Sequence, residues 1–299
     1  MIPALLATVL FAVSTISGRR NVRLLGSAGA NFWRQLLAVL VLALYAHTLG
    51  QGWHGASLPW FLLSGFIGFG IGDVAIYLAL PRIGARLSAL ITQCLAAPLG
   101  GLMAWGWHGT RPTVAEAIAG WLILAGVALA LTPGRSDPTQ PRPASIQWSG
   151  VGFGLLAALG QAGGQVVSKH GFQLAQAAHT PADPLTVTYQ RILPGVTVGL
   201  IWFLLDRYAW PSPVAPKPEY RRAWPWVLLN MLAGPTLGVA CFQWATKVAN
   251  TSLVLSITAM TPLCVMTMAY FFEGERPSRR GVIGGIIAVI GVVSLAHAA

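Results

Sequence analysis

The sequence predicts an all-α polytopic membrane protein with ten transmembrane helices arranged as two five-helix inverted repeats. Of its 299 residues, 55% are hydrophobic and only 9% are charged, whereas about a quarter of the residues in a soluble domain are charged. Apolar stretches of about 20 residues recur along the chain, and a helix of that length crosses a bilayer while satisfying its own backbone hydrogen bonds. In addition, one segment of the chain occurs twice.

The ten helices are expected at residues 2–18, 31–49, 58–80, 86–107, 114–132, 148–168, 185–206, 223–244, 250–272 and 281–297. The first is interpreted as a helix and not as a signal peptide. No basic region precedes it, and no small-residue cleavage site follows it.

The repeated segment occupies residues 109–127 (GTRPTVAEAIAGWLILAGV) and 274–292 (GERPSRRGVIGGIIAVIGV), in which seven of nineteen positions are identical. The match extends upstream, where Ala85, Ser88, Pro98 and Leu99 align with Ala249, Ser252, Pro262 and Leu263. A Pro-rich connector at 133–147 separates a first repeat, 1–132, from a second, 148–299. Because each repeat has an odd number of helices, the second must enter the membrane from the opposite side, which allows the halves to rock about a central site.

These residues resemble the drug/metabolite transporter superfamily, specifically its EamA-type ten-helix members. The likeness covers nearly the whole chain. It is carried by ALPRIGARLSALI running to Pro98, by Gly274–Glu275, and by the G-x5-G pattern of the fifth and tenth helices. The resemblance implies a secondary transporter, often an exporter of small metabolites or amino acids, with a cavity between the halves. The chain departs from the pattern at Thr110, where the first repeat would usually carry a glutamate.

Enzyme chemistry is not expected. The chain has no H-E-x-x-H, G-x-S-x-G or P-loop motif, and its histidines and cysteines lack metal-ligand spacing. The sequence therefore predicts no catalytic residues, metal or cofactor. The expected partners are a small-molecule substrate and membrane lipid, while the oligomeric state stays open. A lipid flippase or another intramembrane lipid-handling protein is the alternative on the same scaffold.

Polar side chains inside predicted spans are the candidates for binding a small polar or amphipathic, amino acid-like substrate. Gln161 and Gln165 lie four residues apart, hence on one helical face. Helix packing is the competing interpretation for such residues, and most tryptophans suit the membrane interface. The predicted substrate-binding set is Tyr77, Gln93, Gln161, Gln165, Tyr189, Gln243 and Trp244.

Pro98 and Pro262 fall near the middle of the predicted fourth and ninth helices. Proline lacks an N–H, so the carbonyls of Cys94 and Thr258 lose their helical partners. The prolines are therefore expected to break these helices, either as simple kinks or as part of a cavity lining.

Asp73 is expected to be functional because a carboxylate inside a membrane helix costs about 2.5–3.5 kcal/mol. Arg34 is the best-placed cation, because Arg191 and Lys247 approach from the opposite membrane face, and Tyr77 is placed to donate a hydrogen bond to Asp73. Two interpretations stay open. Arg34 and Asp73 form a permanent structural pair, or Asp73 exchanges a proton as the cavity opens and couples transport to protons.

Charge predicts the orientation. Fifteen of the nineteen Lys and Arg residues fall on one predicted face, which leaves Arg111, Lys169, Arg191 and Lys247 for the other. The positive-inside rule places the basic face in the cytoplasm and both termini outside the inner (plasma) membrane, whereas members of the resembled family usually keep both termini inside. Basic loops facing anionic lipid account for the net charge of +11 without a nucleic-acid partner.

Overall fold

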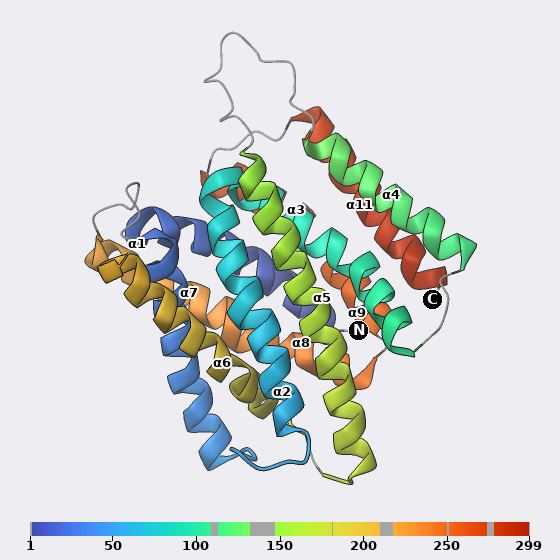
Figure 1. Cartoon of the computed structure of the whole chain (residues 1–299). Coiled ribbons are helices and arrows are strands. Elements are labelled where there is room, and N and C mark those ends of the chain that lie inside the picture. Colours follow the sequence, from blue (N-terminus) through green and yellow to red (C-terminus); the bar gives the residue numbers. More distant parts are fainter. Residues whose placement is uncertain are drawn as a thin grey trace.

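The computed structural model describes residues 2–108, 113–131, 147–180, 182–209, 218–249, 251–273 and 278–298, and no strand occurs among them (Figure 1). The elements up to the connector are α1 (Ile2–Thr48), α2 (Leu58–Gly65), η1 (Phe66–Gly72), α3 (Asp73–His108) and α4 (Val114–Leu131). Those after it are α5 (Trp148–Ala177), α6 (Pro184–Leu204), η2 (Leu205–Ala209), α7 (Tyr220–Met231), η3 (Leu232–Thr236), α8 (Leu237–Val248), α9 (Thr251–Thr258), α10 (Thr261–Glu273) and α11 (Arg279–Ala298). Residues 133–146 of the connector, Thr110, Gly274 and Glu275 lie outside the described residues.

Five helical stretches of the described chain are long and apolar enough to cross a membrane: Ile2–Thr48, Leu58–Trp107, Trp148–Ala177, Pro184–Ala209 and Tyr220–Val248. The first two contain 47 and 50 residues. At about 1.5 Å per residue, a straight helix of that length would be more than twice as long as the roughly 30 Å hydrocarbon core is thick. Each of these two stretches is bent.

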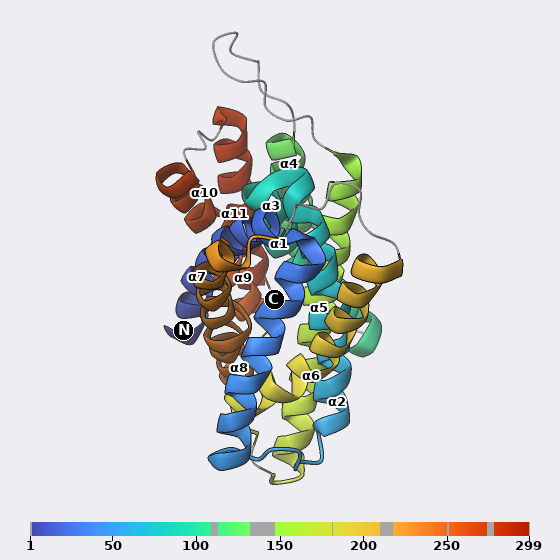
Figure 2. The same cartoon turned by 90° about the vertical axis from the view of Figure 1, so that its left-hand side faces the viewer.

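Glycine makes both bends. Gly26 in α1 has φ 76° and ψ 168°, and Gly84 in α3 has φ 76° and ψ 169°. A residue with a β-carbon rarely adopts such a positive φ, so glycine lets the chain change direction within one residue. The bounds expected for the first two helices, 2–18 and 31–49, are therefore too short, because residues 19–30 are helical on both sides of Gly26. The second segment of α1 then runs alongside α6 and α8 (Figure 2).

Two short π-helical turns interrupt the long stretches at related places. η1 separates α2 from α3, and η3 separates α7 from α8. A π-helical turn is wider than an α-helical one, and such turns are frequent at functional sites. The two turns contribute to the same cavity, described below.

Small residues let the helices approach closely where α5 and α6 pack on the α2–η1–α3 stretch. A methyl group added at Gly160 in α5 would lie only 2.6 Å from the Cα of Gly72, and one added at Gly65 would overlap the backbone of Arg191 in α6. Close backbone contact of this kind is typical of membrane helices, because lipid tails provide no hydrophobic drive for helix association.

The two copies of the repeated segment meet in the fold. α4 and α11 lie side by side (Figure 1). A methyl group at Gly126 would come within 2.6 Å of the Gly284 carbonyl oxygen, and one at Gly291 would lie 2.8 Å from the Ile123 side chain. Gly126 and Gly291 occupy matching positions of the two copies of the repeated segment, so equivalent glycines form the contact on both helices.

Candidate substrate-binding site

A cavity of about 140 Å³ lies where helices from before and after the connector converge. α1, η1 and α3 supply one part of its wall, and α5, α6, η3 and α8 supply the other. Phe11, Phe69 and Phe242 contribute apolar surface. The polar lining consists of Ser14, Thr15, Arg34, Asp73, Tyr77, Gln93, Gln161 and Arg191.

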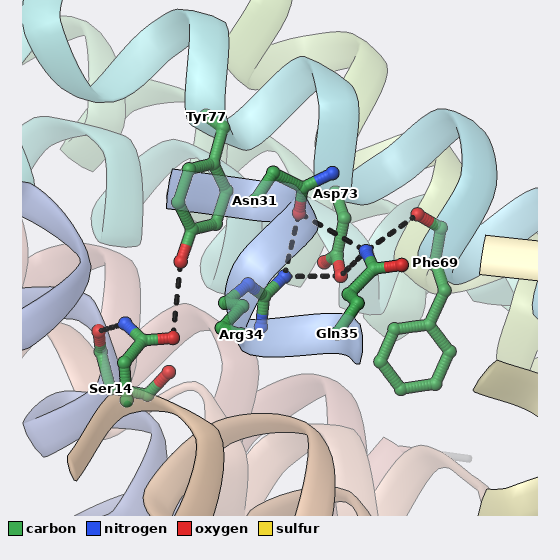
Figure 3. Close-up of polar contacts among 8 residues, drawn as sticks. Ser14, Asn31, Arg34, Gln35, Phe69, Asp73 and Tyr77 are labelled. Carbon is green, nitrogen blue, oxygen red and sulfur yellow. Dashed lines mark hydrogen bonds and ion pairs between the residues drawn. The ribbon is translucent and has the colours of Figure 1, made fainter. Parts of the chain in front are cut away.

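The ion pair expected between Arg34 and Asp73 is present (Figure 3). Nη2 of Arg34 donates to Oδ2 of Asp73 and also contacts Oδ1 of Asn31 at 3.2 Å. Nε2 of Gln35 donates to the same carboxylate oxygen at 3.0 Å. The Arg34 side chain is 5% exposed and that of Asp73 is 21% exposed. The pair is thus largely removed from solvent but open to the cavity on its acidic side.

Tyr77 does not donate to Asp73, contrary to the expectation. Its hydroxyl donates to Oδ1 of Asn230 at 3.1 Å, and Nδ2 of Asn230 donates to the Ser14 carbonyl at 2.7 Å. The guanidinium carbon of Arg34 lies 4.6 Å from the centre of the Tyr77 ring, a cation–π contact. Tyr77 therefore supports Arg34 through its ring and joins α3 to α7 through its hydroxyl.

Gln93 and Gln161 also lie in the cavity wall. Nε2 of Gln161 donates to Oε1 of Gln93 at 2.6 Å, which connects α5 to α3. Each amide keeps further hydrogen-bonding capacity. Of the predicted substrate-binding residues, Tyr77, Gln93 and Gln161 are the ones that line this cavity.

The other four predicted binding residues lie elsewhere. Gln165 and Gln243 are 1% and 0% exposed, and they bond to each other at 3.1 Å, with Gln165 also donating to Thr246. Tyr189 contacts His47 at 3.0 Å, away from the cavity lining. Trp244 is 52% exposed and points outward. These residues are placed to pack helices together or to face the surroundings.

The two prolines differ in their effect. α3 continues through Pro98 without interruption, so Pro98 does not break its helix as expected. Pro262 follows a real break, because α9 ends at Thr258 and α10 begins at Thr261. The hydroxyl of Thr261 donates to the Thr258 carbonyl at 2.6 Å. The Thr258 carbonyl, which loses its helical partner because of Pro262, thus accepts a hydrogen bond from a side chain of the protein. Neither proline lines the cavity.

Arg191 is the site residue that the sequence interpretation missed. The sequence predicts it only on the opposite membrane face, but it lies 5% exposed in the wall of the cavity that contains Asp73. A signal was available, because FWR at residues 32–34 aligns loosely with YQR at 189–191, which sets Arg34 opposite Arg191. An arginine therefore occurs near the start of the second helix of each repeat.

The described residues contain no group of three or more His, Cys, Asp or Glu side chains that could hold a metal ion. What defines the site is a small, partly open cavity between long apolar helices, with a largely apolar wall that also carries polar and charged side chains. Multi-pass membrane transporters bind their substrates in cavities of this kind between helices.

Comparison with known proteins supports the same class of protein. The model of the EamA-like transporter family matches residues 1–132 and again residues 148–296. The chain belongs to this family of membrane transporters, which confirms the resemblance seen in its sequence. A solved structure titled only "Crystal structure of protein" is 17% identical with a TM-score of 0.59, over 98% of this chain and 95% of the other. That likeness shows the shared fold. None of the curated proteins matches the chain significantly.

Proposed function

We propose that the protein is a secondary transporter that moves a small polar or amphipathic, amino acid-like metabolite by alternating access, in the direction of export. Ten crossings form two inverted five-helix repeats, 1–132 and 148–299, joined by 133–147. The cavity carries the proposal, because its wall combines helices from both proposed repeats. Rocking one repeat against the other would open such a cavity to one side of the membrane at a time.

The size of the cavity favours a small solute over the alternative, a lipid. About 140 Å³ accommodates a molecule of amino-acid size but not a diacyl lipid. The lining supplies both polar groups and aromatic surface, which suits an amphipathic solute. A flippase would also need an opening between helices for the acyl chains.

Counterflow in vesicles tests the proposal. We expect purified protein in liposomes preloaded with an amino acid to accumulate the same labelled amino acid, with and without a pH gradient. Protein-free liposomes provide the background. Faster exchange of a labelled lipid between leaflets, without solute counterflow, would instead support the lipid-handling alternative. Export is tested in cells, where expression should lower the internal level of the accepted solute.

Orientation is a second expectation, with the basic loops in the cytoplasm and both termini outside. In the structure Arg34 and Arg191 belong to the cavity. Arg34 is one of the fifteen Lys and Arg residues on the basic face, and Arg191 is one of the four on the other face. Leaving both out of the count does not change which face is the more basic. We expect a C-terminal alkaline phosphatase fusion to be active and a C-terminal green fluorescent protein fusion to be dark. The reverse pattern would place the termini inside.

A further inference from the structure

The buried guanidinium of Arg191 forms no ion pair with any described carboxylate, although Asp73 lies near enough to interact with it electrostatically. Arg191 is 5% exposed, and its Nε and Nη1 atoms have no hydrogen-bond partner among the described residues. No described acidic residue forms an ion pair with it, and its guanidinium carbon lies 5.7 Å from the centre of the Phe69 ring, a distant cation–π contact. A buried charge is strongly unfavourable unless it is paired and hydrogen-bonded. Arg191 therefore lies in the cavity wall with donors that no described residue uses.

Comparison with Arg34 shows that Arg191 lacks an acidic partner from its own repeat. Arg34 occupies the related position of the first repeat and is neutralised by Asp73. The stretch of the second repeat that would supply the equivalent acid, residues 232–244 (LAGPTLGVACFQW), contains no Asp or Glu. The charged residues in the described lining are thus Arg34, Asp73 and Arg191. The cavity keeps one uncompensated positive charge.

The surrounding helices hold this guanidinium in place. The Arg191 backbone packs directly on Gly65, where no β-carbon fits. Nη2 lies beside two further glycines, since methyl groups at Gly68 and Gly164 would come within 3.2 Å and 3.3 Å of it. No side chain from these positions covers the guanidinium or competes for its N–H groups. The arrangement is that of a pre-organised donor group.

We propose that Arg191 binds the carboxylate of the substrate, which supplies the negative charge that the second repeat lacks. The inference rests on the proposed transport function and specifies its substrate as a carboxylate. Arginine suits this role because its planar N–H groups match both oxygens of a carboxylate. Asp73 forms its ion pair with Arg34 and not with Arg191, so the two related arginines have separate tasks. Arg34 stabilises the protein through its ion pair with Asp73, and Arg191 binds the ligand.

Binding by the wild-type protein provides the first test and needs no variant. Purified protein is titrated with the proteinogenic amino acids, with short monocarboxylates, and with the amide and the decarboxylated amine of each amino acid, and its melting temperature is recorded. We expect acids to stabilise the protein and their amides and amines to bind at least about tenfold more weakly, the loss of one charged hydrogen bond. Equal binding of acid and amide would overturn the inference while leaving transport intact. Absence of counterflow for every solute would instead overturn the proposed function.

Variants provide the second test. Arg191→Gln should weaken binding of the accepted acid by about tenfold or more while changing that of its amide by less than about twofold. Arg191→Lys keeps the charge but loses the planar pair of donors, so it should bind at an intermediate level. Arg222→Gln is the control, since Arg222 lies at the surface in an exposed pair with Glu219. Equal losses for acid and amide in Arg191→Gln would contradict a carboxylate contact.

Stability without ligand distinguishes this role from a structural one. A charged group that is paired only when the ligand is bound destabilises the ligand-free protein. Arg191→Gln should therefore keep or raise the melting temperature, by up to about 2–4 °C. Arg34→Gln, which leaves Asp73 unpaired, should lower it. If Arg191→Gln is destabilised as much as Arg34→Gln, Arg191 is a structural residue and the inference is wrong.

Discussion

Asp73→Asn is expected to destabilise the protein strongly, because it leaves Arg34 without its counter-ion in a cavity that already contains Arg191. Removing one partner of a buried pair typically costs about 3–5 kcal/mol. The substitution keeps the shape of the side chain and removes its charge. The measurement is the unfolding of purified protein in detergent, followed by its tryptophan fluorescence.

A double-mutant cycle shows whether the pair itself is responsible. Arg34→Gln combined with Asp73→Asn removes both charges, so the double variant should lose clearly less stability than the sum of the single variants. The exposed pair of Glu219 and Arg222, 2.9 Å apart, is the matched control. Glu219→Gln should cost less than about 1 kcal/mol, since surface pairs contribute little. Additive losses at Arg34 and Asp73 would contradict a structural pair.

The same variant addresses proton coupling, the other interpretation of Asp73. If Asp73→Asn folds with nearly unchanged stability and catalyses counterflow, but no longer responds to a pH gradient, Asp73 is the coupling carboxylate. If its gradient-driven transport equals that of the wild type, Asp73 has no coupling role. The opening of this carboxylate toward the cavity, at 21% exposure, is what makes proton exchange worth testing.

Gly65→Ala is expected to have the second large effect, although it adds only one methyl group. That methyl would overlap the backbone of Arg191, so α2 and α6 must move apart. Overpacking at such a contact costs about 1–3 kcal/mol, and it displaces the guanidinium from the cavity. We expect a lower melting temperature and weaker substrate binding together.

Two other glycines serve as controls. Gly101 in α3 and Gly152 in α5 are helical and exposed, and a methyl group at either would meet no atom within 4 Å. Gly101→Ala and Gly152→Ala should be neutral or slightly stabilising, because alanine is the better helix former. If Gly65→Ala behaves like these controls, the close contact with Arg191 does not limit stability.

The sequence determined the features that depend on composition, helical periodicity and repetition. Low charge and long apolar stretches predict a helical membrane protein, and the second copy of the 109–127 segment predicts two related halves. Asp73 was identifiable because a carboxylate is rare in such surroundings. Its pairing with Arg34 followed from their expected depth in neighbouring helices. Each of these features can be predicted from the sequence of one helix or of two adjacent helices.

Which polar residues meet depends on how the helices pack in three dimensions. Tyr77 bonds to Asn230, 153 positions away, and Gln165 bonds to Gln243, 78 positions away. Such contacts depend on the rotation and tilt of each helix, which are set by packing against several neighbours. The same reason explains why Gln165, Tyr189, Gln243 and Trp244 lie outside the cavity. It also explains Arg191, whose place beside Gly65 and the cavity arises from the way α6 packs on α2 and η1, a contact that no local pattern specifies.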